Sequence, residues 1–264
     1  MGRGGAALFD WFRGRRYNPV MLVIDRLTKR FGDKVAVDAL SLEVRAGELY
    51  AFLGPNGAGK TTTLKCVAGL LWPSAGRISV GGHDVHGNSL AAKRLLSYVP
   101  DQPYLYEKLS GREFLLFVAR LYGLDRQAAA SAVGRVLELF EAHEWADELS
   151  ENYSHGMRQK IVLSAALLHD PKLLVIDEPM VGLDPGSTRL VKSVLRQRVE
   201  AGCAALVSTH TLPVAEEIAD RVGILHRGRL LAEGTHQELR RKAAGSERLE
   251  DIFLQLTGSN SLSP

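Results

Sequence analysis

Short apolar runs alternate along the chain with longer segments in which apolar residues recur at helical spacing. The runs 20–27 and 35–44 flank a polar segment, 28–34, which predicts two strands joined by a polar turn. Continuous apolar runs predict strands buried on both faces, and helical patterns separate them; the runs are 49–53, 173–176 and 204–208. This alternation favours an α/β fold in which helices cover both faces of a mostly parallel sheet.

One long stretch, 111–169, has helical periodicity and interrupts this alternation. Apolar residues recur every three or four positions in 114–122 and again in 133–140, as they do on the buried face of a helix. A further helix is expected to begin at Ser154. We therefore predict a helical subdomain, at about 103–169, inserted into the α/β pattern.

Composition and charge narrow the class of protein. Of the 264 residues, 45% are hydrophobic and 24% are charged, as in ordinary globular proteins. The formal net charge of +3 is too small to favour nucleic acid, so no nucleic-acid partner is expected. The two cysteines, Cys66 and Cys203, lie in apolar segments far apart in the sequence. They are predicted to be buried free thiols in a reducing compartment.

The sequence predicts a cytoplasmic protein. No stretch approaches the roughly 20 apolar residues that a membrane-spanning helix needs, and residues 1–20 lack the continuous apolar core of a secretory signal. Residues 1–19 are rich in Gly and Arg and contain the apolar island Leu8-Phe9-Asp10-Trp11-Phe12. Two interpretations stay open for this tail: a disordered segment, and a short helix that rests its aromatic side chains on an anionic bilayer.

The most specific chemistry lies where the apolar run 49–53 meets a glycine-rich turn. Gly54, Gly59, Lys60 and Thr61 complete the motif G-x-x-x-x-G-K-T between a predicted strand and a predicted helix, the context of a phosphate-binding loop. Glycines let backbone N–H groups surround phosphate oxygens, and the helix start adds its dipole. Lys60 would reach the β- and γ-phosphates, and the Thr61 hydroxyl would bind Mg²⁺. The predicted nucleotide-binding residues are Gly54, Pro55, Asn56, Gly57, Ala58, Gly59, Lys60, Thr61 and Thr62.

Two adjacent carboxylates, Asp177 and Glu178, directly follow the apolar run 173–176. Ligands of open α/β sheets bind outside the carboxyl ends of the strands, so both side chains are expected to face the nucleotide. Asp177 is predicted to coordinate Mg²⁺, directly or through water. Glu178 is predicted to orient and deprotonate the water that attacks the γ-phosphate.

Several motifs, in order along the chain, resemble those of the nucleotide-binding subunit of ATP-binding-cassette (ABC) transporters. Gly182-Leu183-Asp184-Pro185 is similar to the D-loop, and Ser208-Thr209-His210 is similar to the segment with the switch histidine. Gln102 stands where the Q-loop glutamine is expected, and Phe31 where an aromatic side chain stacks on adenine. The segment that begins Tyr153-Ser154-His155-Gly156 looks like the signature motif.

The resemblance covers roughly residues 20–255 and implies the fold class. The expected fold is that of a P-loop NTPase, with a mostly parallel, RecA-like sheet, an N-terminal antiparallel β-subdomain and the inserted helical subdomain. It implies an ATPase domain at 20–240, preceded by a basic flexible tail at 1–19. A C-terminal helix and tail are expected at 241–264, because Leu249-Glu250-Asp251-Ile252-Phe253 looks like the C-terminal helix of export-type members.

The resemblance also implies the ligands and the site. ATP and Mg²⁺ are the expected cofactors, and an integral-membrane permease and a second ATP-binding subunit are the expected partners. Gln102 would act in catalysis and bind the metal, and His210 would hold the γ-phosphate and the attacking water. Ser154 and Gly156 would contact the γ-phosphate bound by the other subunit of a two-fold dimer, and Asp184 would belong to the same nucleotide site. The protein would lie on the cytoplasmic face of the cell membrane.

The signature departs from the usual Leu-Ser-Gly-Gly-Gln of the family. His155 replaces the first glycine and Met157 replaces the glutamine, whereas Ser154 and Gly156 are retained. A histidine at this position would make dimer closure sensitive to pH. Since Lys60 and the catalytic side chains are all present, we expect a site competent for hydrolysis.

Other functions fit the sequence less well. A GTPase is excluded because the chain has no Asn-Lys-x-Asp motif to read guanine. A non-transport ABC ATPase of the translation or DNA-repair type and a regulatory ATP-binding module are the alternatives. The single cassette without a heptad run disfavours the first, and the intact Glu178 disfavours the second. Export is favoured over import, and the sequence leaves open the transported substrate and the choice between a homodimer and a heterodimer.

Overall fold

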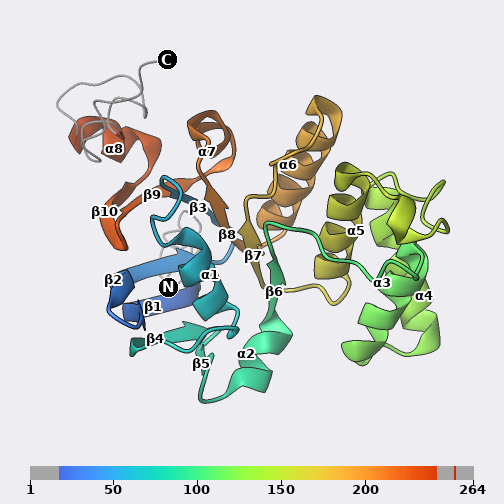
Figure 1. Cartoon of the computed structure of the whole chain (residues 1–264), viewed down its shortest axis with the longest axis horizontal. Coiled ribbons are helices and arrows are strands. Elements are labelled where there is room, and N and C mark those ends of the chain that lie inside the picture. Colours follow the sequence, from blue (N-terminus) through green and yellow to red (C-terminus); the bar gives the residue numbers. More distant parts are fainter. Residues whose placement is uncertain (1–17, 243–252, 254–264) are drawn as a thin grey trace, which may run out of the picture.

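A computed structural model of the chain describes residues 18–242 and residue 253 (Figure 1). Most of the predicted tail at 1–19, with its apolar island, lies outside the described residues. The same holds for the predicted C-terminal helix and tail at 241–264, apart from residues 241, 242 and Phe253. Phe253 is helical and packs against the core of the main sheet.

A six-stranded sheet forms the centre of the molecule, in the order β10-β9-β3-β8-β7-β6 (Figure 1). Neighbouring strands are parallel except for the β9–β10 hairpin. Every residue of β3, β7 and β8 is buried, which explains why these strands appear in the sequence as continuous apolar runs. The strands are β3 (Leu49–Leu53), β6 (Leu96–Val99), β7 (Leu173–Asp177), β8 (Ala204–Thr209), β9 (Arg221–His226) and β10 (Arg229–Gly234).

A second, four-stranded antiparallel sheet has the order β2-β1-β4-β5. Its strands are β1 (Val20–Phe31), β2 (Lys34–Arg45), β4 (Ala75–Val80) and β5 (His83–Asp84). The predicted turn between these two strands is present but shorter than 28–34: β1 continues to Phe31, which pairs with Lys34, so the turn is confined to residues 32 and 33. Here the strand residues are polar or half exposed, and their backbone is satisfied by pairing with β2 rather than by burial.

Eight α-helices and a short 3₁₀-helix, Ser150–Asn152, are present among the described residues. Ser110 and Glu113 form a reciprocal capping box at the start of α3, and Asp125 caps α4. The helices are α1 (Lys60–Val67), α2 (Ser89–Leu95), α3 (Gly111–Leu121), α4 (Arg126–Leu139), α5 (His155–Leu167), α6 (Pro185–Glu200), α7 (Leu212–Ile218) and α8 (His236–Lys242).

Three hydrophobic clusters hold these elements together. One face of the main sheet packs against α1 and the antiparallel sheet, with Tyr50 and Phe52 among its buried residues. The other face packs against α5, α6 and α7, and a separate cluster joins α3, α4 and α5. The third cluster is the core of the helical subdomain, which lies at one end of the molecule (Figure 1). The predicted fold class is therefore confirmed.

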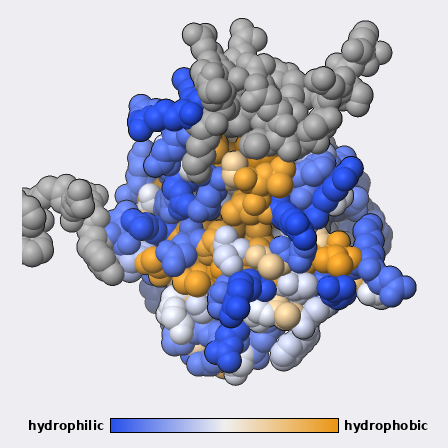
Figure 2. Space-filling view, turned by 90° about the vertical axis from the view of Figure 1, so that its left-hand side faces the viewer, coloured by the Kyte–Doolittle hydropathy of each residue, from blue (hydrophilic) through white to orange (hydrophobic). Residues whose placement is uncertain are grey.

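Apolar side chains form a band among charged ones on the side of the molecule that carries β2 and β10 (Figure 2). Such mixed surface is ordinary for folded proteins and alone assigns no partner. In the part of the chain that the structure describes, no helix has the length and apolarity to cross a bilayer.

Cys66 and Cys203 are buried and free, as predicted, and burial raises the pKa of each thiol to about 11.

Replacement of Phe52 by Ala tests the packing between the two sheets. The Phe52 side chain is fully buried, with its ring centroid 5.6 Å from that of Tyr50. We expect Phe52→Ala to lower the free energy of unfolding by about 3–5 kcal/mol, because the lost contacts leave a cavity. Urea denaturation would measure this change.

The matched control is Phe117→Ala, since the Phe117 side chain on α3 is 42% exposed. Its free energy of unfolding should change by no more than about 0.5–1 kcal/mol. Equal losses in the two variants would contradict the assignment of Phe52 to the core.

Candidate functional site

The phosphate loop connects β3 to α1 and adopts backbone angles that favour glycine. Gly57 and Gly59 have φ values of +81° and +106°, in the left-handed region where a side chain is strained. Gly59 is the N-cap of α1 and has no side chain that could satisfy the helix's first N–H groups. These N–H groups, together with the helix dipole, form a site suited to phosphate.

Lys60, the first residue of α1, is buried beneath this loop. Its Nζ donates to Gly54 O at 2.6 Å and lies 3.4 Å from Pro55 O and 3.5 Å from Glu178 Oε1. Burial lowers the pKa of Lys60, and the negative charge of Glu178 opposes this shift. The ammonium group is therefore held at the loop by backbone carbonyls and a carboxylate, where a phosphate would receive its hydrogen bonds.

Asp177 ends β7 and is fully buried. Burial raises the pKa of its carboxyl group, and interactions with the Ser208 and Thr61 side chains partly offset this effect. The Ser208 hydroxyl donates to Oδ1, whereas Oδ2 has no hydrogen-bond partner among the described residues. A buried carboxylate oxygen without a partner, close to the Thr61 hydroxyl, is an oxygen donor set that fits Mg²⁺.

Glu178 and His210 lie at the ends of neighbouring strands and contact one another. The register of β7 and β8 pairs Asp177 with Ser208, so the residues that follow both strands emerge at one edge of the sheet. His210 Nδ1 lies 3.0 Å from Glu178 Oε1. The Glu178 side chain is 14% exposed and that of His210 is 47% exposed. Glu178 therefore lies between Lys60 and His210 and contacts both side chains.

A cleft of about 500 Å³ lies above the phosphate loop. Of the predicted site residues, Pro55 to Thr62, Phe31 and Glu178 line it, whereas Gly54 does not. Phe31 is 49% exposed, and Lys29 Nζ lies 5.0 Å from the centre of its ring. Sequence reasoning missed further lining residues that come from three separate segments of the chain: Lys34, Val35, Ala36, Asp101 and Arg227.

Gln102 follows β6 in an exposed loop and does not line this cleft, whereas its neighbour Asp101 does. Asp177 and His210 are also outside this lining, although each lies next to Glu178. Ser154, Gly156 and Asp184 lie outside the lining as well. Ser154 caps α5 and accepts from the Met157 N–H at 3.2 Å, and Asp184 caps α6 by accepting from two N–H groups. The hydrogen bonds that Asp184 accepts lower the pKa of its carboxyl. Ser154, Gly156 and Asp184 therefore form a second group, separate from the cleft.

The second group has two parts: Ser154 and Gly156 at the start of α5, and Asp184 at the start of α6. His155 connects these two parts. Its Nε2 lies 3.1 Å from Val181 O, so Nε2 carries the proton in this contact. A side-chain carbon on Gly182 would lie 2.9 Å from the His155 ring, which shows how closely the two segments pack. Through His155 the start of α5 is therefore joined to the segment before α6.

Comparison with known proteins gives matches over most of the chain. The family model described as "ABC transporter" matches residues 37–181. The linearmycin resistance ATP-binding protein LnrL of Bacillus subtilis is 36% identical over 239 residues, which cover 90% of this chain and 75% of the relative. The daunorubicin resistance ATP-binding protein DrrA3 of Streptomyces coeruleorubidus is 38% identical, with 90% and 74% covered.

Solved structures agree with these matches. The structure of an ATP-binding subunit of an ABC transporter superposes with a TM-score of 0.84 at 32% identity, over 89% of this chain and 99% of the other. A dimeric ATP-binding cassette bound to ADP and Pi superposes with a TM-score of 0.75, over 81% and 98%. Its identity of 22% supports a shared fold alone.

The raised pKa of Asp177 generates a prediction about stability and pH. Between the unfolded value of about 3.9 and the higher folded value, the folded chain binds more protons, so its free energy of unfolding falls as pH rises. Asparagine does not titrate. The free energy of unfolding of Asp177→Asn minus that of the wild type should therefore increase as pH rises from about 4 towards neutrality.

Urea denaturation at several pH values, in EDTA and without nucleotide, would measure this difference. Any constant effect of the substitution cancels, because only the slope with pH is used. A difference that is flat or falls with pH would contradict the raised pKa.

Proposed function

The chain belongs to the ABC transporter family, and from this premise we propose that it hydrolyses ATP to drive export through a separate membrane permease. The observation that carries the hydrolytic part is the cluster of Lys60, Glu178 and His210 at the mouth of the phosphate loop, with contacts of 3.5 Å and 3.0 Å to one carboxylate oxygen. We propose that this arrangement holds a cation, a base and an imidazole beside the γ-phosphate.

ATP is proposed to bind with its phosphates in the loop from Gly54 to Thr62. Phe31, which lines the cleft and is half exposed, is proposed to stack on adenine. Asp177 and Thr61 would hold Mg²⁺, with Gln102 as a further proposed ligand after movement of its exposed loop. The ion supplies charge neutralisation of the phosphates when it is bound.

Glu178 is proposed to act as the general base. Its carboxylate is mostly buried and lies beside the phosphate loop, so it can orient a water and accept its proton. His210 would fix the position of this carboxylate and contact the γ-phosphate. Lys60 would stabilise the charge that develops on the phosphate oxygens.

We further propose a two-fold dimer as the active form. Ser154, Gly156 and Asp184 lie outside the cleft of their own chain, so a second subunit would bring them to the nucleotide. Each subunit would contribute these residues to the nucleotide site of the other, and this reciprocity suits an isologous interface. The dimeric ADP-bound cassette noted above has this fold.

Export is proposed from the names of the relatives, which are resistance proteins for linearmycin and daunorubicin and a Nod factor export protein. The proposed location is the cytoplasmic face of the cell membrane, through attachment to the permease. A non-transport ABC ATPase and a regulatory ATP-binding module are the alternatives. Co-purification with a membrane permease would favour the transporter subunit over the non-transport ATPase. Turnover of ATP would exclude the regulatory module.

The substitution Glu178→Gln tests the proposed reaction. Loss of the base should lower the ATP turnover rate by about 10²–10⁴-fold. ATP affinity should be retained, because the phosphate loop is untouched. Size-exclusion chromatography in ATP and Mg²⁺ should then show an accumulated dimer, since hydrolysis no longer reopens it.

The matched control is Glu138→Gln, an exposed position on α4, which should keep wild-type turnover. A Glu178→Gln variant that hydrolyses ATP at the wild-type rate would contradict the role of Glu178. A wild-type protein that binds ATP without turnover, in the presence of its membrane partner, would instead favour the regulatory module.

A further inference from the structure

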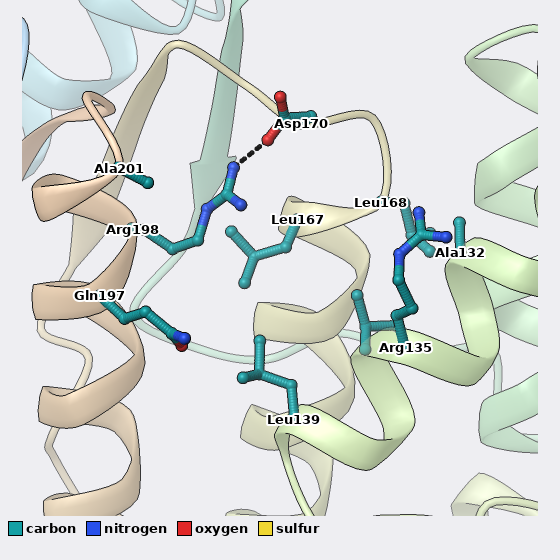
Figure 3. Close-up of a pocket in the computed structure, with 10 residues that line it drawn as sticks. Ala132, Arg135, Leu139, Leu167, Leu168, Asp170, Gln197, Arg198 and Ala201 are labelled. Carbon is teal, nitrogen blue, oxygen red and sulfur yellow. Dashed lines mark hydrogen bonds and ion pairs between the residues drawn. The ribbon is translucent and has the colours of Figure 1, made fainter.

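A second cleft, of about 570 Å³, lies between α4, α6 and the end of α5, and shares no residue with the nucleotide cleft (Figure 3). Clefts of roughly 300–1,000 Å³ are the usual size of small-molecule sites. All of its lining residues lie in parts of the chain that the structure describes. Nothing in the proposed hydrolysis of ATP uses this cleft.

The floor of the cleft is apolar. Val136 and Leu139 of α4 and Leu167 of α5 line it, and Leu139 and Leu167 are only partly covered by protein. Leu167 packs against both the cluster of the main sheet and that of the helical subdomain. The cleft therefore lies at the seam between these two parts of the molecule, where an apolar ligand would replace solvent on exposed hydrocarbon.

Arg198 of α6 supplies hydrogen-bond donors at one wall. One terminal nitrogen donates to Asp170, and the other points over Leu167 (Figure 3). Its Nε is buried and has no acceptor among the described residues. A guanidinium carries N–H donors on each of its nitrogens, and the hydrogen bond to Asp170 uses one terminal nitrogen. An acceptor bound in the cleft would accept a hydrogen bond from the other terminal nitrogen.

The charges around the cleft favour an anion. Arg135 of α4 lies at the opposite wall, exposed, with one nitrogen donating to Ser131 Oγ at 2.8 Å. Asp170 is the acidic group of the lining, and it is paired with both Arg198 and Lys172. These contacts lower the pKa of the Asp170 carboxyl. Two guanidinium groups against one carboxylate leave a positive potential over an apolar floor.

We propose that this cleft binds a small organic anion with an apolar body, of the class of a medium-chain carboxylate. Arg198 binds the carboxylate of the ligand, and Arg135 adds positive potential. The hydrocarbon part of the ligand lies against Leu167 and Leu139. Because α4 belongs to the helical subdomain and α6 packs on the main sheet, the bound anion contacts both parts at once. Occupancy would therefore favour the relative position of the two parts seen here.

Isothermal titration calorimetry of the full chain with octanoate tests the proposal, with acetate as an anion that lacks the apolar body. Octanoate should bind saturably at one site per chain, and acetate should not. Arg198→Gln should weaken octanoate binding at least tenfold, by loss of charge-assisted hydrogen bonds. Ala201→Phe, at an exposed position lining the cleft, should abolish binding by filling the space.

The control Arg126→Gln removes an exposed charge from α4 outside the cleft and should leave binding unchanged. Octanoate that fails to saturate the wild type, or binds equally to Arg198→Gln and Ala201→Phe, would overturn the proposal. Equal affinity for acetate would also overturn it, because the apolar floor would then play no part. Since Arg198→Gln adds no bulk, it provides a test even if Ala201→Phe does not fold.

Discussion

The nucleotide cleft depends on close backbone contact between the phosphate loop and two hairpins. A side-chain carbon on Gly54 would lie 2.3 Å from Leu225 O of β9, and one on Gly59 would lie 2.5 Å from Ala36 O of β2. The Gly228 N–H, at the turn between β9 and β10, donates to Ala58 O at 2.8 Å. Segments near both ends of the described chain thus fix the shape of the loop. A side chain in place of either glycine would force the loop away from these segments.

The sequence predicted best those features that depend on contiguous residues. β3, β7 and β8 are buried on both faces, so each is a continuous apolar run that needs no knowledge of its neighbours. α2 and β5 could not be predicted, because Ala92 is the one buried residue of α2 and β5 has two residues. Such elements carry no periodicity, and tertiary contacts alone determine them.

The rest of the cleft could not be predicted because it is assembled from distant segments. Lys34 and Ala36 come from β2, Asp101 follows β6, and Arg227 lies in the β9–β10 turn. None belongs to a motif, and their meeting depends on strand order and hairpin packing. Arg227 alone carries a local signal, because it is a basic residue next to a glycine; in the structure it lies in a turn, with φ of +48°.

Adjacent side chains in a strand normally point to opposite faces of the sheet, yet Asp177 and Glu178 are proposed to serve one site. The backbone resolves this at Glu178, which leaves the strand with a left-handed φ of +49°. Such a conformation is strained for a non-glycine residue and persists because neighbouring contacts impose it. The Ser208 hydroxyl makes two of these contacts, since it donates to Asp177 and accepts from the Glu178 N–H at 3.0 Å. One hydroxyl on β8 therefore sets the relation between the buried carboxylate and the carboxylate that His210 contacts.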